Sequence, residues 1–216
     1  MQHIINISGG KDSTAVFLLA LELAEKKGFC FRSVFADTGH EHPATYQYIS
    51  NLAERFGVEI ETVKADFTKQ IERKREFIAK NWTKHEASRA LDVLKPTGIP
   101  FLDLCMWKGR FPSSQARFCS YELKAAPIEE KVVLPALKQG HVLQWIGIRR
   151  EESRFRAKTP RYRWSDCGAM LWYPVVSWTA QDIFSYLRRH DVKPNPLYNS
   201  GCGRVGCMPC IHARKE

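Results

Sequence analysis

The sequence lacks the features of a membrane-spanning or secreted protein. Asn6 interrupts the first apolar run and Glu22 the next, so no run reaches membrane-spanning length. A glycine-rich turn begins at residue 8, which leaves no room for a signal peptide, and no internal repeat or low-complexity linker is present. The 216 residues, 44% hydrophobic and 26% charged, fit one globular domain with a substantial core. We therefore expect a cytoplasmic protein with no membrane partner.

Two common phosphate-binding motifs are also absent: the sequence has neither Gly-x-x-x-x-Gly-Lys-Ser/Thr nor Gly-x-Gly-x-x-Gly at a strand-to-helix turn. The chain instead carries Ser8-Gly9-Gly10-Lys11-Asp12-Ser13 between a short apolar run, 4–7, and a helical pattern that continues to Gly28. Such a turn offers backbone N–H groups at the positive end of a helix. Glycines allow close approach, hydroxyls donate, and the lysine adds charge. The stretch predicts a site for a phosphate-type anion.

The first half of the chain alternates strand and helix patterns. After the first strand and helix, residues 31–39 read as a strand ending in a turn, 43–56 as a helix, and 58–63 as a strand. We therefore expect an α/β fold, doubly wound, with a mostly parallel sheet and helices on both faces. Ligands bind such sheets at the carboxyl ends of strands, at a topological switch point. The Ser8 turn and Asp37-Thr38-Gly39 both fall at strand ends.

The second half is less regular. Residues 68–95 read as helical and basic, which predicts either a solvated face or a surface for nucleic-acid phosphates. Residues 100–124 are expected to form an irregular functional loop. We expect a helical stretch over 121–138 that Pro127 and Pro135 break. Strands are expected over 141–148 and 172–176, followed by a helix from Thr179 to Arg189.

Charge and cysteine content point to further partners. A net charge of +10 favours an anionic partner larger than one nucleotide, although an inert basic surface is the alternative. Seven cysteines in a cytosolic chain favour metal or redox chemistry over disulfides. Cys202-x4-Cys207-x2-Cys210 has the spacing of an iron–sulfur site, while zinc and unliganded thiols stay open. No histidine has finger spacing, although His212 lies nearby.

Five motifs occur in an order that carries a family resemblance: 8–13, 37–39 with Pro43, Arg117-Phe118-Cys119 with Leu123-Lys124, Gly147-Ile148-Arg149 with Glu152-Ser153, and 195–198. Together they resemble the phosphoadenosine phosphosulfate (PAPS) reductase family of the PP-loop ATP pyrophosphatases, the adenine nucleotide α-hydrolase superfamily. The resemblance extends to the branch that contains phage and DNA-phosphorothioation proteins. It implies a PP-loop domain over 1–200, with a helical, basic insertion at about 67–125, and a cysteine-rich metal-binding tail over 201–216.

The resemblance implies roles for the motif residues. The phosphate-binding residues would be Ser8, Gly9, Gly10, Lys11, Asp12 and Ser13. The nucleotide pocket would be lined by Asp37, which would help to hold Mg²⁺, with Thr38 and Gly39. The opposite side would be closed by Gly147, Arg149, Glu152, Ser153 and Arg154, unless this stretch is only a charged surface loop. The catalytic groups would be Lys11, Asp12 and Arg149, the arginine stabilising charge on the transferring phosphate.

The cysteines have family counterparts too. The Val205-Gly206-Cys207-x-x-Cys210 stretch resembles that of relatives carrying a [4Fe–4S] cluster, which often have cysteine at the positions of Cys105 and Cys119. The implied metal ligands are therefore Cys105, Cys119, Cys207 and Cys210, with zinc as the alternative metal. Cys202 would be a substitute ligand or a catalytic thiol, and Cys30 and Cys167 would be ordinary residues.

One departure bears on the reaction. Reductases that act on PAPS carry a modified loop and end in a Glu-Cys-Gly-Leu-His motif, whereas this chain keeps Ser-Gly-Gly-Lys-Asp-Ser and has no such ending. We therefore expect cleavage of ATP, with Mg²⁺, to AMP and pyrophosphate. This would activate an acceptor, DNA or RNA held by residues 68–95 and 149–163, for sulfur transfer from a donor such as a cysteine desulfurase.

Two other functions stay open. The first is a reductase of PAPS or adenosine phosphosulfate (APS) that produces sulfite with electrons from thioredoxin. The second is a nucleotide-binding, non-catalytic partner of a DNA-modification complex. A homodimer is an open possibility in each case.

Overall fold

The computed structural model describes residues 1–208, 210 and 211. In this part of the chain six strands form one sheet in the order β3-β2-β1-β4-β6-β5. Neighbouring strands are parallel, except that β5 runs antiparallel to β6. The predicted α/β fold with a mostly parallel sheet is therefore confirmed. The strands are β1 (Gln2–Ile7), β2 (Phe31–Ala36), β3 (Ile60–Val63), β4 (Val142–Trp145), β5 (Tyr162–Trp164) and β6 (Met170–Trp172).

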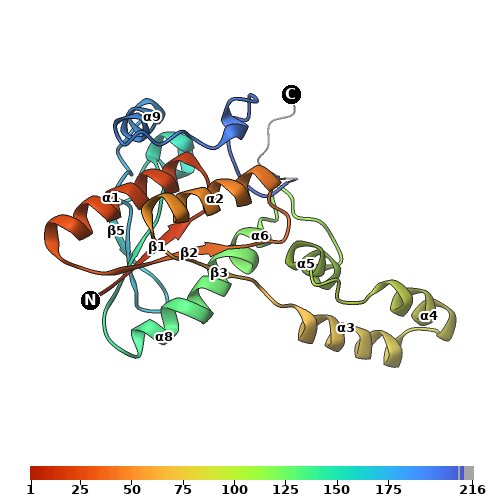
Figure 1. Cartoon of the computed structure of the whole chain (residues 1–216). Coiled ribbons are helices and arrows are strands. Elements are labelled where there is room, and N and C mark those ends of the chain that lie inside the picture. The colour runs from red at the N-terminus through yellow and green to blue at the C-terminus, as the bar shows by residue number, and fades with distance from the viewer. Residues whose placement is uncertain (209, 212–216) are drawn as a thin grey trace.

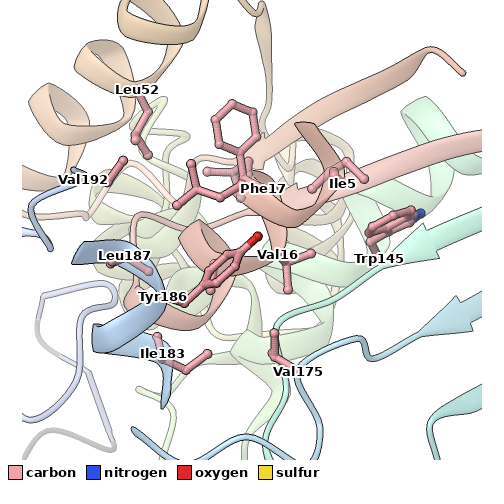
Figure 2. Packing of buried hydrophobic residues seen from close by; sticks show 14 of the residues in the cluster. Ile5, Val16, Phe17, Leu52, Trp145, Val175, Ile183, Tyr186, Leu187 and Val192 are labelled. Carbon is pink, nitrogen blue, oxygen red and sulfur yellow. The ribbon is translucent and has the colours of Figure 1, made fainter. Parts of the chain in front are cut away.

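Helices cover both faces of the sheet (Figure 1). On one face lie α1 (Lys11–Lys27), α2 (Pro43–Phe56) and α9 (Ala180–Arg189). Figure 2 shows Tyr186 and Leu187 of α9 on one side of Val16 of α1, with the sheet residue Trp145 on the other side. The opposite face packs Ile4, Val34 and their neighbours against the helical stretch over 118–137. Burial of these two apolar layers fixes how the strand ends lie relative to one another.

That helical stretch corrects a prediction. Pro127 and Pro135 do not break it, because each proline lies in the first turn of a short α-helical piece that follows a π-helical segment. A π-helical turn bonds five residues back instead of four, so the missing N–H and the ring of proline are accommodated. The pieces are α6 (Phe118–Ser120), η1 (Tyr121–Ala125), α7 (Ala126–Ile128), η2 (Glu129–Val133) and α8 (Leu134–Leu137).

Three helices form an arm beyond the β3 edge of the sheet (Figure 1). The single helical run predicted over 68–95 is two helices, since the Thr83 side chain accepts from the Glu86 N–H and caps a new one. The irregular loop predicted over 100–124 was wrong at both ends, because 100–108 and 118–124 are helical. Pro100 suits the first turn of the first of these helices. The arm consists of α3 (Thr68–Asn81), α4 (Lys84–Val93) and α5 (Pro100–Lys108).

Basic residues of α3 hold the arm together. Lys74 donates from Nζ to two carbonyl oxygens in the last turn of α5, at 2.7 and 3.0 Å. Arg75 donates from Nη1 to two carbonyl oxygens at the end of α4, at 2.6 and 2.5 Å. These carbonyls lack partners within their own helices, so both side chains act as caps. Part of the basic character of residues 68–95 is therefore structural.

The last part of the chain contains β5, which the sequence did not predict. The strand expected at 172–176 was misplaced, because β6 overlaps it only at Trp172 and residues 174–177 form a turn. Thr179 and Asp182 form the predicted capping box of α9. Short 3-10 turns complete this part: η3 (Arg150–Glu152), η4 (Arg154–Arg156) and η5 (Pro196–Tyr198). Among the described residues, no helix has both the length and the apolar character that crossing a bilayer requires.

Candidate nucleotide site

The loops that follow β1 and β4 meet at the switch point of the sheet. β1 lies between β2 and β4, and all three run parallel, so the chain leaves their carboxyl ends at one edge. The connections from β1 and β4 diverge there, which in α/β sheets creates the crevice for a ligand. The Ser8–Ser13 loop follows β1, and Gly147 to Arg149 follow β4.

The Ser8–Ser13 loop is shaped by its own hydroxyl groups and by a positive φ angle. Gly9 has φ +68°, and a Cβ there would lie 2.7 Å from Thr45 Cγ2, so this position requires glycine. Ser13 Oγ accepts from the Ser8 N–H at 3.1 Å and lies 3.0 Å from Ser8 Oγ. Gly10 precedes α1 and has no side chain to cap it, so no side-chain oxygen of its own takes the place of an anion at the first turn.

Gly147 acts by its lack of a side chain. A Cβ at this position would lie 2.7 Å from the Ser13 nitrogen and 2.9 Å from the Asp12 carbonyl oxygen. The end of β4 therefore packs directly on the first turn of α1. Gly147, predicted as nucleotide-binding, here permits a close backbone approach that sets the position of the loop.

A buried ion pair joins the loop to the segment after β4. Arg149 donates from Nε to Asp12 Oδ1 at 2.5 Å, and its side chain is 4% exposed. Its Nη1 pairs with Glu151. Glu151 also accepts from the Ala180 N–H, at 2.8 Å, and so reaches the first turn of α9. The starts of α1 and α9 are thereby connected through one guanidinium group.

The electrostatics of this pair follow from burial and charge. Burial is the largest influence on Asp12 and raises the pKa of its carboxyl, while Lys11 and Arg149 act in the opposite direction. Burial opposes the charge of Arg149, but the Asp12 carboxylate raises the pKa of Arg149 above its ordinary value. Arg149 thus contacts two carboxylates, and its predicted contact with a transferring phosphate stays a prediction.

The turn after β2 forms the second wall of the site. Asp37 Oδ1 accepts from the Gly39 N–H at 2.7 Å and from the Tyr46 hydroxyl at 2.6 Å, and Oδ2 lies 3.0 Å from Lys64 Nζ. Burial opposes ionisation, but these hydrogen bonds and the ammonium hold the pKa of Asp37 below its ordinary value. Asp37 therefore shapes this turn, and its predicted contact with Mg²⁺ stays untested.

The residues next to Asp37 have structural contacts as well. Gly39 has φ +70°, and a Cβ there would lie 2.8 Å from Pro100 Cδ, so the turn packs tightly on the start of α5. Thr38 donates from Oγ1 to Glu41 at 3.1 Å. Lys124 Nζ lies 3.5 Å from the same Glu41 oxygen, whose side chain is 1% exposed. The turn is therefore held on both sides by buried polar contacts.

Two residues of the site had no role assigned from the sequence. Tyr198 accepts through its hydroxyl from the Lys11 N–H at 3.0 Å, and Lys11 Nζ lies 5.1 Å from the centroid of its ring. Asn195 donates from Nδ2 to the Gly9 carbonyl oxygen at 3.2 Å. Burial raises the pKa of Tyr198 to about 12. The 195–198 motif was the signal, but nothing local in it shows that it contacts residues 9–11.

The tail after residue 200 lies against the β2 turn. The Met208 N–H donates to the His40 carbonyl oxygen at 2.6 Å, and Cys207 forms an isolated antiparallel bridge with Glu41. Residues from 195 to 208 therefore contact both the Ser8–Ser13 loop and the turn after β2. The remaining tail residues, including His212, lie outside the described residues.

The four predicted metal ligands form two pairs. Cys105 and Cys119 are buried in one apolar cluster, where burial and the nearby Cys119 raise the pKa of the Cys105 thiol. A hydrogen bond with Cys210, together with burial, raises the pKa of the Cys207 thiol. Within residues 1–208, 210 and 211, no three His, Cys, Asp or Glu side chains are placed to hold one metal ion. The described residues therefore do not bring the four cysteines together as one site, and the predicted ligand set stays untested.

Three further predicted residues follow Arg149 on the surface. Glu152 Oε2 accepts from the Arg149 N–H at 3.2 Å and pairs with Arg156. Ser153 and Arg154 are exposed. The structure therefore brings the Ser8–Ser13 loop, Gly147 and Arg149 together, with Glu152 tied to them through Arg149, while Ser153 and Arg154 lie outward.

Comparison with known proteins decides the family. The model of the phosphoadenosine phosphosulfate reductase domain matches residues 2–213. The chain belongs to this family. The expected membership is thereby confirmed at the level of the PAPS reductase domain and the PP-loop superfamily, whereas the branch of phage and DNA-phosphorothioation proteins stays a prediction.

Individual relatives of this PAPS reductase-family protein include phage proteins and reductases. Over 233 residues it is 50% identical to an uncharacterized 37.8 kDa protein in the gpa 5′ region of Escherichia phage 186, covering 99% of this chain and 68% of that protein. It is 34% identical over 93 residues to an adenosine 5′-phosphosulfate reductase of Streptomyces coelicolor, covering 43% of this chain and 37% of that enzyme. It is 27% identical over 179 residues to adenosine 5′-phosphosulfate reductase 1 of Bacillus subtilis, with 82% and 61% covered. The chain thus spans less than two thirds of either reductase.

Solved structures share the fold. A PAPS reductase from Candida auris, in a phosphate complex, matches with a TM-score of 0.57 and 18% identity, covering 96% of this chain and 82% of that one. An FMN adenylyltransferase from Candida glabrata, in complex with FMN and the ATP analogue AMPCPP, matches with a TM-score of 0.55 and 18% identity, covering 100% and 59%. These likenesses confirm the PP-loop type of α/β fold.

Proposed function

We propose that the Ser8–Ser13 loop binds the phosphates of ATP and that the protein cleaves ATP to AMP and pyrophosphate, thereby activating an acceptor for sulfur transfer. The supporting observation is the loop itself: an intact Ser-Gly-Gly-Lys-Asp-Ser turn at the start of α1, beside the switch point, with Asp12 buried against Arg149. A pyrophosphate group carries more negative charge than a single phosphate. The N-terminus of α1 and the ammonium of Lys11 together offer the positive charge that such a group requires.

The chemistry follows in two steps. An acceptor oxygen attacks the α-phosphorus, the bond to the bridging oxygen breaks, and pyrophosphate leaves with the electron pair. The terminal sulfur of a persulfide, supplied by a donor such as a cysteine desulfurase, then attacks the activated carbon or phosphorus of the acceptor, and AMP leaves with the electron pair. A reducing thiol then attacks the remaining sulfur–sulfur bond, so that the acceptor keeps the sulfur as a thiol and the donor is released as a disulfide. Lys11 and the first turn of α1 stabilise the charge that develops on pyrophosphate. Asp37 would help to hold a Mg²⁺ ion bound with ATP, which would supply further positive charge for the pyrophosphate.

Arg149 supports this chemistry through Asp12. Its guanidinium holds the carboxylate next to Lys11, whose Nζ lies 3.8 Å from Asp12 Oδ2. The ammonium is thereby oriented at the loop instead of moving freely in solvent. Through Asp12, Arg149 is thus a positioning residue for Lys11.

The second candidate is reduction of a sulfonucleotide, PAPS or APS, to sulfite. It is favoured by the identity to adenosine 5′-phosphosulfate reductases and by the thiols of the tail beside the β2 turn. In this reaction a thiolate attacks the sulfur of the bound nucleotide, the nucleotide phosphate leaves, and thioredoxin supplies the electrons that release sulfite. A third function, a non-catalytic nucleotide-binding subunit of a DNA-modification complex, keeps the same loop without turnover.

One set of assays separates these functions. We expect Mg²⁺-dependent pyrophosphate release from ATP that is lost in Asp12→Ala and retained in Asp92→Ala, an exposed carboxylate of the arm. Sulfite release from PAPS or APS with thioredoxin, without pyrophosphate release from ATP, would instead establish the reductase. Tight ATP binding with neither product would establish the non-catalytic subunit.

The predicted metal is tested separately on the same preparation. Protein purified without oxygen is analysed for iron, sulfide and zinc, and compared with the double variant Cys105→Ser/Cys119→Ser. Iron with sulfide that is lost in the variant would support a [4Fe–4S] cluster on the predicted cysteines, whereas stoichiometric zinc would support the alternative metal. Metal-free protein with full activity would remove the cluster from the proposal.

A further inference from the structure

The segment after Arg149 carries positive charge that no carboxylate neutralises. Six cations lie between residues 150 and 164, together with two carboxylates, Glu151 and Glu152. Both carboxylates are used, the first by Arg149 and the second by Arg156. In the described part of the chain, the other five cations form no ion pair with a carboxylate: Arg150, Arg154, Lys158, Arg161 and Arg163. Their charge is available to an external anion.

Exposed aromatic rings alternate with these cations. Phe155 is 89% exposed, Trp164 62% and Tyr162 50%, although burial of such rings is strongly favourable. The Arg117 guanidinium lies 5.9 Å from the centroid of the Phe155 ring, which adds a cation to the same surface. Tyr162 stacks on Trp172 with ring centroids 5.8 Å apart and ring planes 10° from parallel. One face of the Tyr162 ring therefore packs on Trp172, which fixes the orientation of the ring. We call residues 150–164 with Arg117 the basic aromatic surface.

The topology places this surface beside the nucleotide site. β5 is the last strand of the sheet and runs antiparallel to β6, with Tyr162 opposite Trp172 at the carboxyl end of β6. That end lies at the same edge as the Ser8–Ser13 loop. The surface also begins one residue after Arg149, which contacts Asp12. A molecule bound there therefore lies next to the loop that would activate it.

The spacing of the rings suits separated bases. Tyr162 and Trp164 lie two residues apart on one strand, so they share a face and are about 7 Å apart along it. This is about twice the 3.4 Å rise between the stacked bases of a duplex strand. Rings at this spacing accept bases that are no longer stacked on each other, which requires a single strand.

The arm fits a nucleic acid less well. Its α3 residues Lys74 and Arg75 are engaged with the carbonyl oxygens of α5 and α4. Four carboxylates lie among the remaining cations of α3 and α4: Glu72, Glu76, Glu86 and Asp92. The basic aromatic surface has more cations per residue than the arm, and it has fewer carboxylates for each cation.

We propose that the basic aromatic surface binds single-stranded nucleic acid, with bases stacked on Phe155, Tyr162 and Trp164 and phosphates held by the five cations without a carboxylate partner. This deepens the proposed function, on which it rests for the reaction, because it names the acceptor class and its docking site. Binding itself needs neither ATP nor turnover. RNA and DNA single strands share the chemistry that this surface recognises, apart from the 2′-hydroxyl.

The test is binding of a labelled oligonucleotide of about 16 nucleotides, as single-stranded DNA, single-stranded RNA and duplex, over a range of salt concentrations. We expect the single strands to bind more tightly than the duplex. Phe155→Ala and Trp164→Ala should each weaken binding by about 10-fold, the loss expected for one stacked base. The triple variant Arg154→Gln/Lys158→Gln/Arg161→Gln should reduce the slope of log affinity against log salt by about 2.

Matched controls lie on the arm. Phe77→Ala removes another exposed ring, and Lys80→Gln/Lys84→Gln/Arg89→Gln removes three exposed cations, so both should leave affinity and salt slope unchanged. Equal losses in the arm variants, equal binding of duplex, or no binding at low salt would each overturn the proposal. Asp12→Ala should retain oligonucleotide binding. Failure of ATP cleavage would therefore count against the proposed function and leave this surface intact.

Discussion

The hydroxyl of Tyr198 accepts a hydrogen bond from the backbone N–H of Lys11 at 3.0 Å, joining residues 187 positions apart. This N–H belongs to the first residue of α1 and has no acceptor within the helix. It is therefore one of the donors that a phosphate oxygen would use. Tyr198 takes the position of such an acceptor, and the 195–198 segment that carries it contacts the loop.

Replacing Tyr198 by phenylalanine tests this relationship. We expect Tyr198→Phe to lower the free energy of unfolding by about 1–3 kcal/mol, because a buried N–H loses its partner. We also expect it to bind pyrophosphate more tightly, because the anion then supplies the missing acceptor. Calorimetric titration with pyrophosphate measures the affinity. The control is Tyr186→Phe, which removes the hydroxyl bonded to Glu22 and should leave pyrophosphate affinity unchanged. Equal affinities in the two variants would contradict a role for Tyr198 at the anion site.

The ion pair of Asp12 with Arg149 should show strong coupling. Arg149→Met leaves a buried carboxylate without its partner and should cost about 3–5 kcal/mol of unfolding free energy. The double variant Asp12→Asn/Arg149→Met removes both charges and should recover a large part of that loss. Denaturant unfolding of the two single variants, the double variant and the unmodified protein gives the coupling energy. Additive losses would show that the pair does not act as a unit.

The low pKa of Asp37 predicts a dependence of stability on pH. Its pKa in the folded protein lies below the ordinary value of 3.8, so the folded state binds the proton more weakly than the unfolded state. The contribution of this carboxylate is therefore fully present above about pH 5 and is lost as the pH falls through the folded pKa. Unfolding free energy measured across the acid range should fall less steeply in Asp37→Asn than in the unmodified protein. Tyr46→Phe, which removes one of its hydrogen bonds, should give an intermediate slope.

Gly147 should not tolerate a methyl group. In Gly147→Ala the added Cβ meets the backbone of Asp12 and Ser13 at less than 3 Å, so the first turn of α1 must shift. We expect a loss of about 1–3 kcal/mol in unfolding free energy and weaker ATP binding. Gly203→Ala is the matched control, because a Cβ there meets nothing within 4 Å. Normal ATP affinity in Gly147→Ala would show that this close packing does not set the phosphate loop.

Local sequence patterns predicted the elements whose cause is local. The apolar run before Ser8, the helix after it and the capping box at Thr179 were all found, because each depends on neighbouring residues. The same patterns placed the Ser8–Ser13 loop and Asp37 at strand ends, and a parallel sheet brings such ends to one edge. The loop, the sheet type and the family were thus accessible from the sequence.

Errors arose where a local rule competed with packing. The prolines of the stretch over 118–137 were expected to end the helix, but burial of Val132 and Val133 against the sheet favours a helix with π-helical segments. β5 was missed because three exposed residues carry no alternation of apolar and polar side chains. It is a strand because it pairs with β6.

Long-range contacts decided the roles within the site. Arg149 meets Asp12 across 137 residues, and Tyr198 meets Lys11 across 187. Whether an arginine faces a phosphate or a carboxylate depends on which side chains the fold brings within reach, and no spacing along the chain encodes that. The local sequence determines which helices and strands form and which functional groups each of them contains. The packing of α1, α9 and the tail on the sheet determines which of those groups touch, because contact energies depend on distance in space.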